Sequence, residues 1–232
     1  MAANPLACAS CPVRDRAACA ALNDGQRSEL SRLGFHRMLK RGETLFHAGD
    51  DSDNCATLIS GALKIAHFDA GGAEHILALV HPAGFVGELF APVAHHDVIA
   101  LTDSQLCVFP RRQYEEVVSR FPALGRALHR RSSEDLFESR ALMALMTGRN
   151  AQVRVAGFLL AMANAASDSP CHPAASFDLP LTRGEIASLL GLTIETVSRQ
   201  LTKLEKESVI ARNGARGIEL VDAARLGTFA AG

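Results

Sequence analysis

Two kinds of hydrophobic pattern divide the chain, and the first of them predicts strands. Between residues 37 and 109, apolar residues alternate with polar ones in short runs that Gly and Asp separate. Short strands at regular spacing, with turn residues between them, predict a small antiparallel barrel or jelly roll. The clearest of the expected strands are Glu43–Phe46, Thr57–Ile59, Leu63–Ile65, Ile76–Val80, Val98–Leu101 and Leu106–Phe109.

The second pattern has helical spacing and lies on both sides of the strands. Asp24–Leu33 predicts a short helix that Asn23 or Asp24 can cap. Arg112–Ser119 and Val153–Ala166 predict two further helices. The chain therefore combines a strand-rich region with separate helices, which is typical of an α+β protein.

Between those two helices, Pro122 opens a long helix with a wide apolar stripe. A stripe of this width must be covered, either by the chain's own barrel or by the same helix of a second copy. We favour a homodimer. The residues expected at its interface are Leu136, Leu142, Met143 and Met146.

A helix-turn-helix pattern occupies residues 181–204. Thr182 and Glu185 form a capping box that starts one helix, and Ala187 is small where two helices would cross. Gly191 supplies a tight turn, and Thr193 can cap a second helix. In this motif the first turns of the second helix enter the major groove of double-stranded DNA.

The exposed face of that second helix carries groups that can read bases. Glu195, Ser198 and Arg199 lie at spacings of three and four residues. An Arg can donate two hydrogen bonds to guanine, a Glu can accept one from cytosine, and a Ser can approach a base or a phosphate. The residues expected to hold the phosphates are Arg183, Lys203 and Lys206. The alternative is a hairpin used for packing, with Glu195 and Arg199 as an ordinary intrahelical pair.

Residues 209–221 read as a β-hairpin with an Asn213-Gly214 turn, and a hairpin after a helix-turn-helix is the wing of a winged helix. Composition adds no global argument for DNA, since the formal net charge is -1. With 48% hydrophobic residues the chain can bury a core. It shows neither a signal peptide nor an apolar run of about 18 residues, so we expect a cytoplasmic protein without a membrane partner.

Three cysteines near the N-terminus suggest metal or redox chemistry. Cys8-x2-Cys11-x7-Cys19 places three thiols on a short segment, and thiolates suit zinc or an iron–sulfur cluster. By its position in an apolar strand, Cys107 alone would be a buried small residue. We take Cys55 and Cys171 to be ordinary thiols. An enzyme is not expected, because neither carboxylates nor nucleophiles stand at motif spacing from the candidate histidines His36, His67, His75 and His81.

Four motifs together resemble the CRP/FNR superfamily of bacterial regulators. They are Gly42-x3-Phe46-x2-Gly49-Asp50, Ile59-x-Gly61-x2-Lys64-Ile65, Gly84-x2-Gly87-Glu88 and Glu195-x2-Ser198-Arg199. The resemblance implies a Cys-bearing arm (1–22), a cyclic-nucleotide-type β-roll (23–121), a dimerisation helix (122–150) and a winged helix-turn-helix (151–232). The last motif is similar to the FNR branch, which implies a homodimer that binds a palindrome of TTGAT-like half-sites and acts with RNA polymerase.

Within that family, members that bind cyclic nucleotides hold the phosphate with an Arg and a hydroxyl residue beyond the Gly-Glu pair. Residues 89–100 contain no Arg and instead contain Asp97, so we expect no cyclic nucleotide. His95 and His96 in the same stretch are expected to be surface residues rather than metal ligands, because adjacent side chains diverge.

The cysteine pattern is similar to that of FNR-type oxygen sensors from alphaproteobacteria, which add one distant Cys late in the β-roll. Cys107 falls there, in Cys-x-Phe-x-Arg-Arg. The resemblance implies a [4Fe–4S] cluster on Cys8, Cys11, Cys19 and Cys107 that ties the arm to the roll and favours the dimer. The chain would then be an oxygen-responsive regulator of anaerobic or microaerobic metabolism. The alternative is a zinc- or thiol-redox-responsive regulator of the same fold.

Overall fold

The computed structural model describes residues 8–147, 150–167 and 172–232. Two compact units divide the chain between Glu138 and Ser139. The first unit begins with two short 3-10 helices, η1 (Cys8–Ser10) and η2 (Ala18–Ala21), and the helix α1 (Asp24–Leu33). Its eight strands are β1 (Phe35–Leu39), β2 (Thr44–Phe46), β3 (Asn54–Ser60), β4 (Leu63–Phe68), β5 (Glu74–Val80), β6 (Phe85–Val86), β7 (Asp97–Ala100) and β8 (Ser104–Pro110).

These strands form two antiparallel four-stranded sheets, in the orders β1-β8-β3-β6 and β2-β7-β4-β5. The side chains between the sheets make one apolar core that includes Leu39, Leu58, Leu63, Val98, Leu106 and Val108. Most expected strands are present, although their ends differ by a few residues. The sequence did not indicate β1 or β6, because β1 lacks clean alternation and β6 has only two residues. The predicted β-roll is confirmed.

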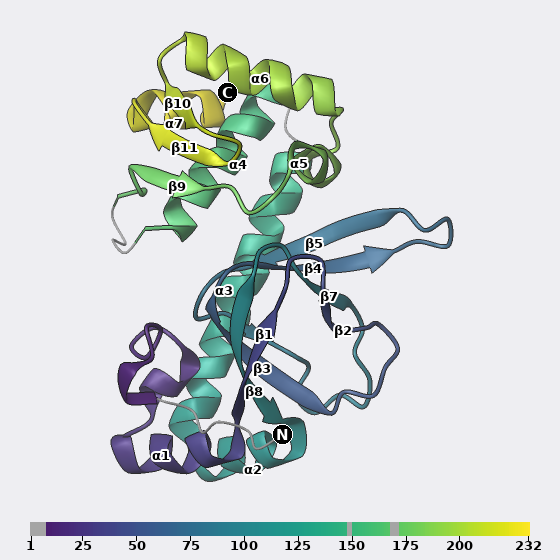
Figure 1. The fold of residues 1–232 in the computed structure, drawn as a ribbon, viewed down its shortest axis with the longest axis vertical. Coiled ribbons are helices and arrows are strands. Elements are labelled where there is room, and N and C mark those ends of the chain that lie inside the picture. The colour runs from purple at the N-terminus through teal and green to yellow at the C-terminus, as the bar shows by residue number, and fades with distance from the viewer. Residues whose placement is uncertain (1–7, 148–149, 168–171) are drawn as a thin grey trace. The chain divides into compact units, whose positions relative to one another are not determined.

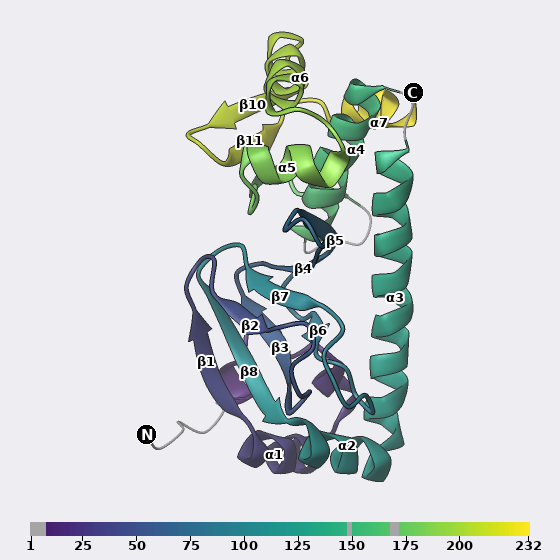
Figure 2. The ribbon, with the colours of Figure 1, turned by 90° about the vertical axis from the view of Figure 1, so that its right-hand side faces the viewer.

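Helices close one end of this roll, where α1 and α2 (Arg111–Arg120) lie together (Figures 1 and 2). Asn23 caps α1 in a capping box: its side chain accepts from Gln26 N at 2.9 Å and its backbone N–H donates to the Gln26 side chain at 3.1 Å. The long helix α3 (Pro122–Met146) begins at the expected proline and crosses the division between the two units.

The second unit contains the helices α4 (Ala151–Ala165), α5 (Arg183–Leu190), α6 (Ile194–Lys206) and α7 (Ala223–Ala231) (Figure 1). Its sheet joins β9 (Ser176–Asp178), β10 (Ile210–Asn213) and β11 (Gly217–Leu220) in the order β10-β11-β9. The wing hairpin is therefore present, but its turn differs from the predicted one. Asn213 pairs with Gly217, so the loop is residues 214–216 rather than a tight Asn-Gly turn.

Within the described ranges, no helix combines the length and the apolar character that crossing a bilayer requires.

Candidate functional site

The turn between α5 and α6 is built from the predicted signals. The Thr182 side chain accepts from Glu185 N at 3.2 Å, and Thr182 N donates back to the Glu185 side chain at 2.7 Å. Gly191 ends α5 with φ +60, a left-handed conformation that glycine adopts without strain. Thr193 then caps α6 by accepting from Thr196 N at 3.2 Å. These local bonds fix the angle at which α6 leaves the turn.

Two kinds of contact fix the helix-turn-helix against the rest of its unit. The inward face of α6 is fully buried at Val197, Leu201 and Leu204. From α4, the Arg154 guanidinium donates to the carbonyl oxygen of Leu190 at 3.0 Å, which satisfies the end of α5. The sequence pattern does not indicate this role of Arg154, because it depends on a contact between segments that are distant in sequence.

The outward face of α6 presents the candidate base-reading groups. Glu195 and Arg199 are exposed, and Ser198 is half-buried beside Arg183, whose guanidinium donates to its hydroxyl at 3.4 Å. Hydrogen bonds from its own backbone N–H and from Thr193 lower the pKa of Glu195, so it stays a carboxylate that can accept from a base. The assignment of these three residues as base contacts stays a prediction.

The candidate phosphate contacts surround this face. Arg183 starts α5, and Lys203 and Lys206 lie in the last turn of α6. All three are exposed. Lys203 donates to the Gln152 side chain at 2.7 Å, so its ammonium is held near the start of α4. Their assignment as phosphate contacts stays a prediction.

In the first unit, the four predicted cysteine ligands line one cavity of about 30 Å³. Cys8 lies in η1, Cys19 lies in η2, and Cys107 comes from β8. Strand alternation directs Leu106 and Val108 into the core of the roll, so Cys107 faces the arm on the other side. Although Cys11 and Cys107 are distant in sequence, they pack against the same small cluster.

The remaining cysteines are different. Cys55, on β3, is fully buried, and its thiol donates to the carbonyl oxygen of Phe109 at 3.8 Å. It is not among the residues that line the cysteine cavity. Cys171 lies outside the described residues.

The surroundings of the cavity disfavour the charged thiolate form of two of its cysteines. Burial, with smaller effects of the neighbouring Cys11, Cys8 and Cys19, raises the pKa of Cys107 to about 12. Burial, Cys11 and Cys8 also raise the pKa of Cys19, whereas the guanidinium of Arg27 lowers it. Four thiolates can therefore share this space only when a positively charged group compensates them.

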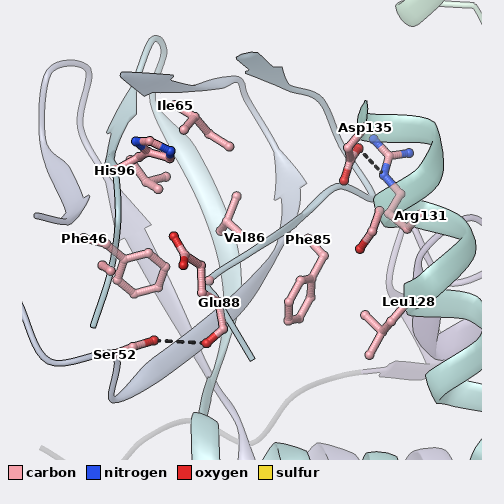
Figure 3. A pocket seen from close by; sticks show the side chains of 14 residues that line it. Phe46, Ser52, Ile65, Phe85, Val86, Glu88, His96, Leu128, Arg131 and Asp135 are labelled. Carbon is pink, nitrogen blue, oxygen red and sulfur yellow. Dashed lines mark hydrogen bonds and ion pairs between the residues drawn. The ribbon is translucent and has the colours of Figure 1, made fainter. Parts of the chain in front are cut away.

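A second cavity, of about 250 Å³, lies in the roll against α3 (Figure 3). Phe46, Phe85 and Leu128 form apolar walls, and Arg131 enters from α3, where its guanidinium pairs with Asp135 at 2.9 Å. Arg131 lies outside residues 89–100, on which the expectation about cyclic nucleotides rests. His96 also lines this cavity, so it is more enclosed than the surface position we predicted, whereas His95 is exposed.

Most of the interface residues predicted on α3 are exposed to solvent in the single chain. The exposed fractions are 49% for Leu136, 56% for Met143 and 38% for Met146. Leu142 is half-buried. Phe137, at 72%, is more exposed than any of them. A run of large apolar side chains in water is a surface that association would bury.

Comparison with known proteins agrees with both units. Residues 36–121 match the cyclic nucleotide-binding domain, and residues 153–229 match the Crp-like helix-turn-helix domain. A probable transcriptional activator of Rhizobium leguminosarum bv. viciae is 37% identical over 94% of this chain and 90% of its own. The transcriptional activator protein FnrL of Cereibacter sphaeroides is 33% identical over the same shares. The structure of FixK2 from Bradyrhizobium japonicum matches with a TM-score of 0.75 and 26% identity, covering 84% of this chain and 96% of that one. The chain belongs to the CRP/FNR family of DNA-binding transcription regulators, which act as dimers and are not enzymes.

Proposed function

We propose that this regulator responds to oxygen through a [4Fe–4S] cluster held by Cys8, Cys11, Cys19 and Cys107. The observation that carries the proposal is the convergence of these four thiols on one cavity. The similarity to FnrL, a transcriptional activator, supports activation of transcription through RNA polymerase. The genes expected under this control serve anaerobic or microaerobic metabolism.

The donor set fits an iron–sulfur cluster better than a single ion. Among the described residues, no three His, Cys, Asp or Glu side chains are placed to hold one metal ion. Zinc needs four ligands that converge on one point, whereas the thiolates of a cluster bind separate irons. The four cysteine side chains that would hold the cluster line one cavity of about 30 Å³. When bound, the cluster supplies the positive charge that four thiolates require and a centre that oxygen can oxidise.

Side-chain packing connects the cysteines with the start of α3. Leu124 and Leu128 from α3 share one buried cluster with Phe109 and Tyr114, and Cys8, Cys19 and Cys107 pack against that cluster. A displacement of the arm therefore changes the packing under the first turns of α3. Because the apolar stripe lies farther along the same helix, this is a physical route from the cysteines to dimerisation.

On DNA, the proposal assigns base contacts to Glu195, Ser198 and Arg199 and phosphate contacts to Arg183, Lys203 and Lys206. Their exposure on α5 and α6 supports this assignment. Two copies must place α6 in successive major grooves about 34 Å apart, so a change in dimerisation changes DNA binding. The expected target is a palindrome of TTGAT-like half-sites.

We also propose that the roll does not bind a cyclic nucleotide. Among the described residues, Arg131 is the one whose guanidinium lines the cavity of the roll, and it pairs with Asp135 at 2.9 Å and with Glu134 at 3.8 Å. Glu88 and Asp135 add carboxylates to the lining. A cyclic phosphate would therefore meet negative charge without an available cation.

Anaerobic purification tests the proposal. Iron and sulfide should each approach four per chain, and the absorbance of the cluster should fall on exposure to air. A protein with zinc but no sulfide would support the zinc-responsive alternative instead. A protein with neither metal would point to thiol redox chemistry.

A further inference from the structure

Arg27 is a buried cation beside the cysteine cavity. It belongs to α1, is 8% exposed and lines the cavity together with the four candidate ligands. Its guanidinium donates to the carbonyl oxygen of Leu22 at 2.9 Å and to that of Cys19 at 3.3 Å. These two bonds hold the charge against the last turn of the arm.

The carboxylate nearest to this guanidinium compensates it poorly. Asp24 lies 3.4 Å from Arg27, but its side chain is 87% exposed and also pairs with Arg14 at 2.8 Å. An exposed carboxylate shared by two arginines is screened by water. A guanidinium remains charged at any ordinary pH, and a buried charge is costly unless an opposite charge lies close to it. The position of Arg27 therefore favours a buried anion on the cavity side.

We propose that Arg27 is the counter-charge of the cluster and protects it from oxidation. This inference rests on the proposed function. A cluster bound by four thiolates carries net negative charge, and net charge is one of the properties that set how readily a cluster gives up an electron. A cation within the cavity wall stabilises the more negative, electron-rich form. A cluster held by these cysteines would therefore be easier to oxidise without Arg27, with dioxygen as the acceptor of the electron.

The test compares four proteins purified without oxygen: wild type, Arg27→Gln, Arg27→Lys and Arg32→Gln. Arg32 lies on the same helix but is exposed, so Arg32→Gln removes an equal charge away from the cavity. Iron and sulfide are measured first, and the decay of cluster absorbance in air-saturated buffer is then followed. We expect Arg27→Gln to decay several-fold faster than wild type, while Arg27→Lys and Arg32→Gln stay close to wild type.

The outcomes separate this inference from the function on which it rests. If wild type contains neither iron nor sulfide, the proposed function and the inference both fail. If wild type and Arg27→Gln contain equal clusters that decay at equal rates, the inference alone fails. It also fails if Arg27→Lys decays as fast as Arg27→Gln or if both lose the cluster, because Lys keeps the charge. Loss of the cluster from Arg27→Gln alone would support the inference.

Discussion

At the scale of single residues, Cys55 and Cys107 lie on neighbouring strands and still have different environments. In the pairing of β3 with β8, Cys55 is opposite Phe109 and Thr57 is opposite Cys107. The thiol of Cys55 is fully buried and bonded to a backbone carbonyl, whereas Cys107 faces the arm and is half-buried. Cys107 is therefore the better candidate for the fourth ligand, because it lies beside the three cysteines of the arm and Cys55 does not.

Replacing Cys107 with Ser should abolish cluster retention, because the hydroxyl is a poor ligand for iron and the link between arm and β8 is lost. Cys55→Ser is the matched control and should retain the cluster, as should Cys171→Ser. Iron, sulfide and the anaerobic spectrum report the result. A normal spectrum for Cys107→Ser, together with loss in either control, would show that the fourth ligand is assigned wrongly.

Arg199 provides a residue-level test of base reading. Its exposed guanidinium can donate two hydrogen bonds to one guanine, so Arg199→Ala should cost about 1–3 kcal/mol of binding free energy. The loss should be confined to one G·C pair of each half-site and disappear when that pair is changed. Binding assays on a set of single-base variants measure this. An equal loss on every sequence would make Arg199 a phosphate contact.

At the scale of elements, sequence reasoning succeeds where the determining contacts are local. The caps at Asn23, Thr182 and Thr193 and the left-handed Gly191 each depend on residues within about one helical turn, and all four are present. The apolar alternation of the longer strands is similarly local. These signals predicted the helix-turn-helix and most of the roll.

Features that join distant segments could not be predicted in this way. Arg131 reaches the cavity of the roll from α3, Arg154 bonds the end of α5 from α4, and Arg27 bonds backbone carbonyls of the arm. None of these contacts leaves a periodic signal. The grouping of Cys107 with the arm followed from the family resemblance, because its own strand pattern indicates only a small buried residue.

The charges that line the cavity of the roll allow a prediction about the binding of cyclic AMP. Because Asp135 neutralises Arg131, cyclic AMP should not bind, and isothermal calorimetry should detect no heat of binding at micromolar concentrations. Asp135→Ala would leave the guanidinium without that partner, so any weak affinity should appear in this variant first. Micromolar affinity in wild type would overturn the prediction.

At the scale of the whole molecule, dimerisation should depend on the exposed stripe of α3. Met143→Glu places a carboxylate on that stripe in both copies, and burial of unpaired charge is costly. We expect the dimer dissociation constant to rise roughly tenfold or more, as measured by analytical ultracentrifugation.

Met38→Glu is the matched control for this experiment, since Met38 lies on β1 and is 62% exposed, against 56% for Met143. Its dimer constant should not change. Equal effects of the two substitutions would mean that α3 is not the specific interface.

The central claim, that oxygen at the cysteine cavity controls DNA binding, is tested most directly by one affinity measurement. Protein purified without oxygen is titrated against a palindrome of TTGAT-like half-sites, and the same preparation is titrated again after exposure to air. Tight binding is expected before air and, because the dimer loosens, binding at least roughly tenfold weaker afterwards, a difference of about 1.4 kcal/mol. Equal affinity before and after air, in a preparation whose cluster absorbance has disappeared, would contradict it.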